Sequence, residues 1–237
     1  MARWGMLIDL DLCTGCNACT IACRQENNIP FVGKEEMDMG RAIRWMELSP
    51  LHEEDAPIAH RVGALIPRNC NHCENPPCIR VCPVSATFKN EEGIVGQIYY
   101  RCIGCRYCTV ACPYTVRYFN WHAYADRVPK SLQKDRNPDV TVRMMGVVEK
   151  CSYCYQRIRE AKRIARLEKR KLQDGDVKTA CQQTCPAKAI YFGDLDDPNS
   201  EVSKRSRTPR LFRLLEDLGT EPKTRYLIEM TEDLLHE

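Results

Sequence analysis

The chain has 237 residues, a formal net charge of +3 and a sequence pI near 8.1, so no charge surplus indicates a nucleic-acid partner. Hydrophobic residues make up 43% and charged residues 28%, which is ordinary for a globular chain of one or two domains. The longest apolar stretches, such as residues 63–66, are far too short to cross a bilayer, so we expect no membrane span. Few residues precede the first cysteine, and we expect no export signal among them.

The first half of the chain contains two cysteine motifs, each preceded by a short apolar stretch that predicts a strand. Motif one comprises Cys13, Cys16, Cys19 and Cys23, and motif two comprises Cys70, Cys73, Cys78 and Cys82. The predicted strands are Met6–Leu10 and Val62–Ile66, and Thr20–Ala22 is expected to start a helix that shields a cofactor. Between the motifs, Arg24–Ala59 carries prolines and mixed charge, which predicts a surface excursion suited to binding a partner.

The second half repeats this organisation. Motif three comprises Cys102, Cys105, Cys108 and Cys112, and motif four comprises Cys151, Cys154, Cys181 and Cys185. We expect strands at Gln97–Tyr100 and Ala189–Phe192 and a short helix at Thr109–Ala111. Aromatic residues surround motif three and are expected to form core: Tyr99, Tyr100, Tyr107, Tyr114, Tyr118, Phe119 and Trp121. Gly15 and Gly104 each precede a cysteine, where a missing Cβ lets backbone amides approach a bound cofactor.

Two longer helices are predicted in the last third of the chain. Tyr155–Leu172, inserted within motif four, is rich in Lys and Arg and has an apolar stripe at helical spacing, formed by Ile158, Ala161, Ile164 and Ala165. Its basic face is either solvated or docks on an acidic partner or on anionic lipid headgroups. In the tail, Arg210–Leu218 predicts an amphipathic helix that ends at Gly219 as its C-cap.

The spacing of the cysteines predicts iron–sulfur clusters. Motifs one and three have the C-x2-C-x2-C-x3-C spacing, in which three thiolates bind one cubane and the fourth binds a second cubane. No cysteine is left over, so sixteen thiolates predict four [4Fe–4S] clusters and a protein that transfers electrons. Zinc sites more often combine two C-x2-C pairs with His, and disulfides are typical of small secreted domains. His72 lies inside motif two; we expect it to tune a cluster or shape a turn, and we do not count it as a ligand.

The lengths of the connections indicate which motifs exchange their fourth cysteine. Nineteen residues separate motif two from motif three, against 46 between motifs one and two and 38 between motifs three and four. Because a short connection is easiest to close, motifs two and three are expected to form one unit, with motifs one and four paired around it. Site A is then Cys13, Cys16, Cys19 and Cys185; site B is Cys23, Cys151, Cys154 and Cys181; site C is Cys70, Cys73, Cys78 and Cys112; site D is Cys82, Cys102, Cys105 and Cys108. Sequential pairing of the motifs is the alternative.

The four motifs in this order, opening with Ile8-Asp9 shortly before Cys13-Thr14-Gly15-Cys16, resemble the four-cluster ferredoxin subunits of membrane-associated oxidoreductases. That family includes electron-transfer subunits of dimethyl sulfoxide, polysulfide and formate-dependent nitrite reductases, and of molybdenum-free quinone-linked relatives. The resemblance covers residues 1–200 and implies an α+β fold of two nested, pseudo-twofold ferredoxin-like domains. Residues 1–60 and 145–200 then form the outer unit, residues 61–125 the inner unit, and residues 201–237 a C-terminal helix and tail.

The resemblance also implies a function. The chain is expected to have no catalytic site and to connect a large catalytic-type subunit, of the molybdopterin type or its metal-free relative, with an integral membrane subunit that binds quinone. A cytochrome c subunit is a further candidate partner. The complex is expected on the bacterial cytoplasmic membrane, bound through these partners, on the periplasmic face after partner-carried export or alternatively on the cytoplasmic face. A soluble polyferredoxin that serves a hydrogenase or formate dehydrogenase is the alternative function.

Overall fold

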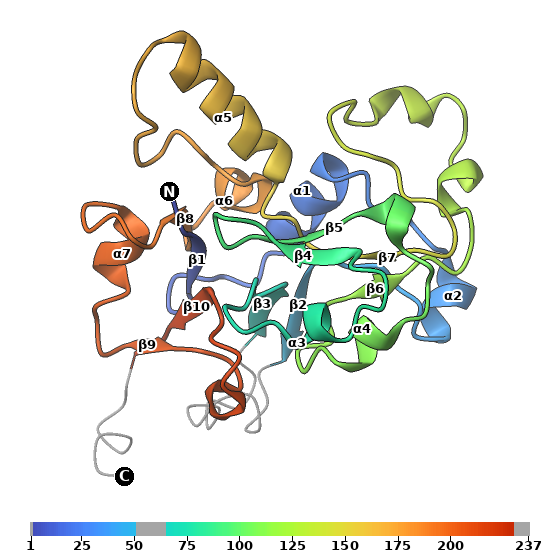
Figure 1. The fold of residues 1–237 in the computed structure, drawn as a ribbon, viewed down its shortest axis with the longest axis horizontal. Coiled ribbons are helices and arrows are strands. Elements are labelled where there is room, and N and C mark those ends of the chain that lie inside the picture. Colours follow the sequence, from blue (N-terminus) through green and yellow to red (C-terminus); the bar gives the residue numbers. More distant parts are fainter. Residues whose placement is uncertain (1, 51–64, 230–237) are drawn as a thin grey trace.

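A computed structural model describes residues 2–50 and 65–229, in which short helices and strands alternate (Figure 1). The helices are α1 (Ala18–Glu26), α2 (Lys34–Asp38), α3 (Pro77–Arg80), α4 (Tyr107–Val110), α5 (Tyr155–Leu167), α6 (Ala180–Thr184) and α7 (Glu201–Arg205). The strands are β1 (Trp4–Asp9), β2 (Met46–Pro50), β3 (Leu65–Asn69), β4 (Thr87–Lys89), β5 (Val95–Gln97), β6 (Tyr118–Phe119), β7 (Val148–Glu149), β8 (Ile190–Asp194), β9 (Leu211–Phe212) and β10 (Thr224–Leu227). This mixture confirms an α+β fold.

The largest sheet joins the two ends of the chain. Its strand order is β8-β1-β10-β9, and β1 pairs antiparallel with β8 and parallel with β10. Every residue of β1 is buried, and successive side chains point to opposite faces of the sheet. Met6 and Ile8 therefore enter the main hydrophobic core, whereas Leu7 packs on the other side against Leu195 and Val202.

Smaller pairs of elements surround the cysteine motifs. Three two-stranded sheets are formed by β2 with β3, β4 with β5, and β6 with β7. The helix of motif one, α1, packs against α6 of motif four, and α3 of motif two packs against α4 of motif three. Segments far apart in sequence therefore lie side by side around the cysteines.

The predicted strands are confirmed in part. Met6–Leu10 and Ala189–Phe192 correspond to β1 and β8, and the short helices expected within motifs one and three are α1 and α4. The predicted strand Val62–Ile66 lies partly outside the described residues, and its last two residues, Leu65 and Ile66, belong to β3. The strand at Gln97–Tyr100 is wrong, because β5 ends at Gln97 and Tyr99–Arg101 forms a 3-10 turn that leads into motif three.

The described part of the segment Arg24–Ala59 is exposed at residues 33–40, as expected of a surface excursion, except for Glu36, but it is also anchored in the core. Within its described part, Ile43, Trp45 and Met46 are buried in the main core. The indole nitrogen of Trp45 donates to the Glu149 carboxylate at 2.9 Å. A buried aromatic anchor therefore fixes this segment to the cysteine-bearing core.

The tail helix predicted at Arg210–Leu218 is also wrong. Leu211 and Phe212 form β9, which pairs antiparallel with β10, and the Phe212 ring stacks on Tyr226 with centroids 5.5 Å apart. Leu215 is left-handed, with φ of 47°, and Glu216–Leu218 is a single 3-10 turn. The gain from pairing with a distant strand overrides local helix propensity. Gly219 does take the left-handed conformation expected of a cap.

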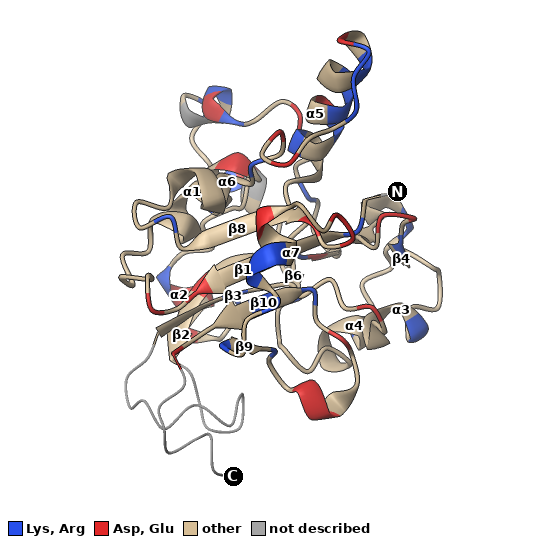
Figure 2. Cartoon of the chain, turned by 90° about the vertical axis from the view of Figure 1, so that its left-hand side faces the viewer, with Lys and Arg blue, Asp and Glu red and all other residues tan. Residues whose placement is uncertain are grey.

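Helix α5 extends away from the body of the molecule and carries Lys and Arg along its length (Figure 2). It starts at Tyr155 as predicted but ends at Leu167 instead of Leu172. Ile158, Ala161 and Ala165 are buried, which confirms most of the predicted apolar stripe, although Ile164 is exposed. Among residues 2–50 and 65–229, no helix is long and apolar enough to span a membrane.

Candidate iron–sulfur sites

All sixteen cysteines lie in the described part of the chain, and all are free thiols. Most are buried, and only Cys16 and Cys105 are exposed. Across residues 2–50 and 65–229, no three His, Cys, Asp or Glu side chains converge closely enough for a single metal ion. The fit to a larger cofactor therefore rests on how the thiols are grouped.

Motifs one and four meet at α1. One cavity is lined by the four cysteines of site A, namely Cys13, Cys16, Cys19 and Cys185. One helical turn further along α1, Cys23 lies among the other three cysteines of site B, Cys151, Cys154 and Cys181, which interact with it electrostatically. The structure thus brings motif four to motif one, although 127 residues separate Cys23 from Cys151.

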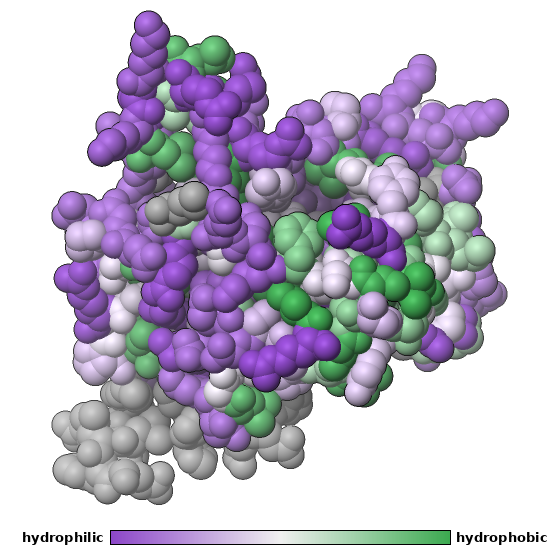
Figure 3. All heavy atoms as spheres, in the orientation of Figure 1, coloured by the Kyte–Doolittle hydropathy of each residue, from purple (hydrophilic) through white to green (hydrophobic). Residues whose placement is uncertain are grey.

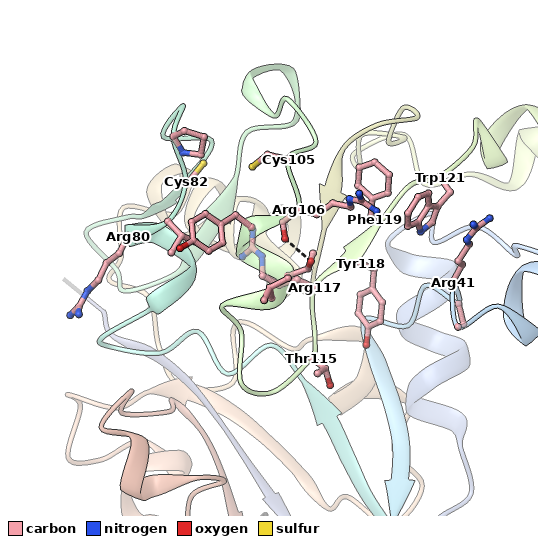
Figure 4. A pocket seen from close by; sticks show the side chains of 17 residues that line it. Arg41, Arg80, Cys82, Cys105, Arg106, Thr115, Arg117, Tyr118, Phe119 and Trp121 are labelled. Carbon is pink, nitrogen blue, oxygen red and sulfur yellow. Dashed lines mark hydrogen bonds between the residues drawn. The ribbon is translucent and has the colours of Figure 1, made fainter.

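Motifs two and three meet between α3 and α4. Cys73 interacts electrostatically with the other cysteines of site C, which are Cys70, Cys78 and Cys112. At site D, Cys108 interacts with Cys102 and Cys105, and Cys82 lines the same pocket as Cys105 (Figure 4). This pocket has a volume of about 1030 Å³ and is open to the surface beside α4.

Three of the motifs end in the same turn, which begins at Cys82-Pro83, Cys112-Pro113 and Cys185-Pro186. The residue three positions after each cysteine is left-handed: Ser85 (φ 50°), Thr115 (φ 53°) and Lys188 (φ 50°). Ala86 then donates its amide to Cys82 Sγ at 3.2 Å, and Ala189 does the same to Cys185 Sγ at 3.3 Å. Because such bonds favour the charged thiolate, the turn itself prepares the sulfur for a metal.

Gly15 and Gly104 each precede a cysteine, and both have left-handed backbones, with φ of 67° and 72°. A Cβ on Gly104 would lie 2.3 Å from the carbonyl oxygen of Gly146, whereas a Cβ on Gly15 would meet nothing closer than Leu65 Cδ1 at 3.4 Å. Gly104 is therefore also required for close packing between two backbone segments.

The buried thiols sit where a negative charge is disfavoured. Burial, together with the neighbouring thiols, raises the pKa of Cys19 and Cys78 to about 11 and that of Cys73 and Cys151 to about 12. Four thiols held together in this way become thiolates only when a cation offsets their mutual repulsion. The donor chemistry and the burial thus fit iron–sulfur clusters.

His72 is fully buried at motif two. Its ring stacks on Tyr153 with centroids 3.8 Å apart, and Nδ1 accepts the Val95 amide at 3.0 Å. Burial, together with nearby Lys150 and Lys223, lowers the pKa of His72, so the imidazole is neutral and its proton lies on Nε2. That N–H has no hydrogen-bond partner among the described residues.

Several polar residues near the cysteines were not predicted from the sequence. Asn27 directs its amide nitrogen to Cys23 Sγ at 3.7 Å, and Asn69 does so to Cys151 Sγ at 3.8 Å. Arg117 is buried near sites C and D. Asn27 follows Cys23 by one helical turn and could have been inferred from helix periodicity, whereas the others depend on tertiary contacts.

The aromatic residues around motif three differ in how far their side chains are exposed, and Tyr99, Tyr118, Phe119 and Trp121 are partly buried. Tyr114 is buried, as expected of core. Tyr100 and Tyr107, in contrast, are exposed, with 83% of Tyr100 accessible, so the expectation of core is wrong for these two. Ile103 and Val110 are exposed beside them. Apolar side chains gather on this half of the molecule, whereas the half with α5 and α7 is mostly hydrophilic (Figure 3).

Two family models match the sequence, and both describe a 4Fe-4S dicluster domain. One covers residues 12–86, which include motifs one and two, and the other covers residues 62–131, which include motifs two and three. The fold and the sixteen free cysteines therefore define a ferredoxin-type protein, and the cysteines fit four [4Fe–4S] clusters.

Relatives from other organisms indicate which kind of ferredoxin-type protein this chain resembles. The chain is 47% identical over 229 residues to the iron–sulfur cluster-binding subunit of menaquinone reductase from Nitratidesulfovibrio vulgaris, which covers 95% of this chain and 88% of the relative. It is 38% identical over 242 residues to iron–sulfur subunit 1 of an Hdr-like menaquinol oxidoreductase from Archaeoglobus fulgidus (94% and 82% covered). It is 36% identical over 221 residues to one of the polypeptides of polysulfide reductase from Wolinella succinogenes (93% and 92% covered).

The chain belongs to the family of iron–sulfur subunits of the dimethyl sulfoxide reductase and polysulfide reductase type. Its function is electron transfer and not catalysis on substrate.

Proposed function

We propose that sites A to D each hold one [4Fe–4S] cluster and that the four form a wire in the order A, B, C, D. Each cluster, when bound, takes up and releases one electron at a time. The exposure of the cysteines is the observation that supports this order of the four sites. Sites A and D each have one exposed cysteine, Cys16 and Cys105, while every cysteine of sites B and C is buried.

Contacts between neighbouring sites support the same order. Cys181 of site B interacts electrostatically with Cys19 of site A, and Cys151 of site B interacts with Cys70 of site C. Cys78 of site C and Cys108 of site D belong to one small hydrophobic core. These contacts support electron entry and exit at the two ends of the chain of sites.

The same contacts support two nested ferredoxin-like domains. In this proposal the outer domain comprises residues 1–60 and 145–200, the inner domain comprises residues 61–125, and residues 201–237 extend the outer domain. The packing of α1 on α6 and of α3 on α4 agrees with a pseudo-twofold arrangement of the motifs.

We propose that the wire connects a catalytic-type subunit with a quinone-interacting membrane subunit, with a cytochrome c subunit as an optional component. The names of the menaquinone-linked relatives support a quinone partner. Exposed apolar residues at site D, namely Tyr100, Ile103, Tyr107 and Val110, support a protein partner at that end.

Purification of the native complex in mild detergent tests the proposed membrane partner: a membrane subunit should co-purify, with about sixteen iron atoms on this chain. Recovery of the chain alone from the soluble fraction would favour the polyferredoxin alternative.

Serine variants test the pairing of the motifs. Cys185→Ser and Cys16→Ser should abolish the same spectral component, and Cys112→Ser and Cys73→Ser should abolish a second one, as resolved by electron paramagnetic resonance of the reduced complex. Loss of one shared component in Cys112→Ser and Cys154→Ser would establish sequential pairing instead.

We further propose that the chain works on the periplasmic face of the membrane and reaches it folded, bound to a partner with a twin-arginine signal. Sixteen free thiols support assembly in the reducing cytoplasm, because unligated thiolates oxidise outside it. Protease added to spheroplasts should cut the chain in the intact complex. Protection while a known outer-face protein is cut would place it on the cytoplasmic face.

A further inference from the structure

Arg117 is a buried cation that lies between sites C and D. It precedes β6, and only 5% of its surface is exposed. It interacts electrostatically with cysteines of both sites, Cys70 and Cys78 of site C and Cys108 of site D. It also lines the pocket that contains the exposed Cys105 (Figure 4). One side chain therefore faces the ligands of two clusters.

The protein does not neutralise this guanidinium. Nη2 donates to two uncharged acceptors, Thr87 Oγ1 at 2.9 Å and Gln97 Oε1 at 2.6 Å. Nε and Nη1 are buried without an oxygen or nitrogen acceptor, the guanidinium lies within hydrogen-bonding reach of the Cys108 thiol, and in residues 2–50 and 65–229 no carboxylate pairs with Arg117. An unpaired buried charge is strongly disfavoured, so an anion beside this side chain would stabilise the fold.

Two other buried cations are compensated by carboxylates. Arg143 pairs with Glu149 at 2.8 Å, and Lys223 pairs with Glu74 at 3.1 Å. Buried Lys150 instead donates to the backbone carbonyl oxygen of Cys151. Arg117 has no compensating carboxylate among the described residues, so its field is directed at the cysteines.

The thiolates of the two sites are the anions available to Arg117. A cubane with four thiolate ligands is itself an anion, and its negative charge grows when it gains an electron. A nearby uncompensated cation therefore stabilises the reduced form more than the oxidised form.

We propose that Arg117 raises the reduction potentials of the clusters at both sites C and D, through its uncompensated charge and the donor nitrogens Nε and Nη1. The inference rests on the proposed function and on the proposed pairing of the cysteines. It assigns Arg117 the role of tuning the reduction potentials of these two clusters. The cluster at site D is then a better electron acceptor than its exposed position alone would make it.

Redox titration of the purified native complex, followed by electron paramagnetic resonance, tests this role. Arg117→Gln should lower the potentials of two of the four clusters and leave the other two unchanged. Arg117→Lys keeps the charge and should retain most of the wild-type potentials. Arg101→Gln removes an exposed charge next to Cys102 and serves as the matched control, with little expected shift because solvent screens it.

Gln97→Glu provides a second probe that leaves Arg117 in place. The new carboxylate would lie at the 2.6 Å contact with Nη2 and neutralise the guanidinium without changing side-chain shape. It should shift the same two potentials downward, even if Arg117→Gln fails to assemble a cluster. Unchanged potentials in fully loaded Gln97→Glu, or an Arg117→Lys variant shifted as far as Arg117→Gln, would overturn the proposal. Iron analysis of the wild type separates this outcome from failure of the proposed function, in which the four clusters themselves would be missing.

Discussion

At the residue scale, Asn27 connects helix geometry with the chemistry of site B. It lies one turn after Cys23, is buried, and directs its amide nitrogen to the sulfurs of Cys23 and Cys154, 3.7 and 3.9 Å away. Hydrogen bonds to cluster sulfur raise the reduction potential. Asn27→Ala should therefore lower the potential of the site B cluster and cost about 1–2 kcal/mol of stability, as measured by redox titration and thermal unfolding.

Asn28 offers a matched control for this prediction. Its side-chain amide donates to the carbonyl oxygens of Asn137 and Val140, both at 2.8 Å, and contacts no sulfur. Asn28→Ala should cost similar stability without changing any potential. Equal shifts of potential in both variants would show that the effect comes from loosening of α1 and not from the bond to sulfur.

Gly104 and Gly15 occupy equivalent positions in motifs three and one but differ in their surroundings. An Ala at either position must adopt a left-handed backbone, which costs about 1–2 kcal/mol. Gly104→Ala would add the 2.3 Å approach to the Gly146 carbonyl oxygen and should destabilise the protein further, with loss of iron from site D. Gly15→Ala should keep its iron. Iron content and thermal unfolding of the two variants measure the difference, and equal losses would contradict the role given to the backbone contact.

At the element scale, two ion pairs attach α5 to other elements, Arg157 with Glu26 and Lys162 with Glu92. Arg157 donates to both carboxylate oxygens of Glu26, at 2.8 and 2.7 Å, and the pair is only partly exposed. Arg157→Met should loosen the helix by about 1–3 kcal/mol and accelerate hydrogen exchange of its amides. Arg163 pairs with Glu160 on the same helix, but both are exposed, so Arg163→Met should change exchange little.

The elements differ in how far sequence determines them. The spacing of the cysteines was sufficient to predict the cofactor and the family, and short apolar stretches were sufficient to predict β1 and β8. The tail was not predictable in this way, because Leu211 and Phe212 suit a helix or a strand and β10 decides between them. Arg117 has no local signal either, since its partners Thr87 and Gln97 come from another hairpin. The types of residue near the cysteines could therefore be predicted from the sequence, but the residues that they contact could not.

At the scale of the whole molecule, the exposure of the cysteines predicts the order in which clusters are lost. Sites A and D each have an exposed cysteine, whereas sites B and C have none. Limited oxidation followed by alkylation should therefore modify Cys16 and Cys105 before Cys151 or Cys73, because access controls thiol reactivity. Mass spectrometry of the alkylated peptides measures the order. Early labelling of Cys151 would indicate that oxidation opens the core before it reaches the ends of the wire.

The position of β1 in the middle of the large sheet has a consequence for how the protein is made. The ribosome produces β1 first, but its parallel partner β10 emerges about 220 residues later, roughly 10–45 s at bacterial or eukaryotic rates of synthesis. During that interval a six-residue apolar strand has an open edge, which favours pairing with other chains. A product that stops at residue 200 would contain all sixteen cysteines yet never close this edge. The smallest unit that can be produced without this open edge is thus set by β10 and not by the last cysteine.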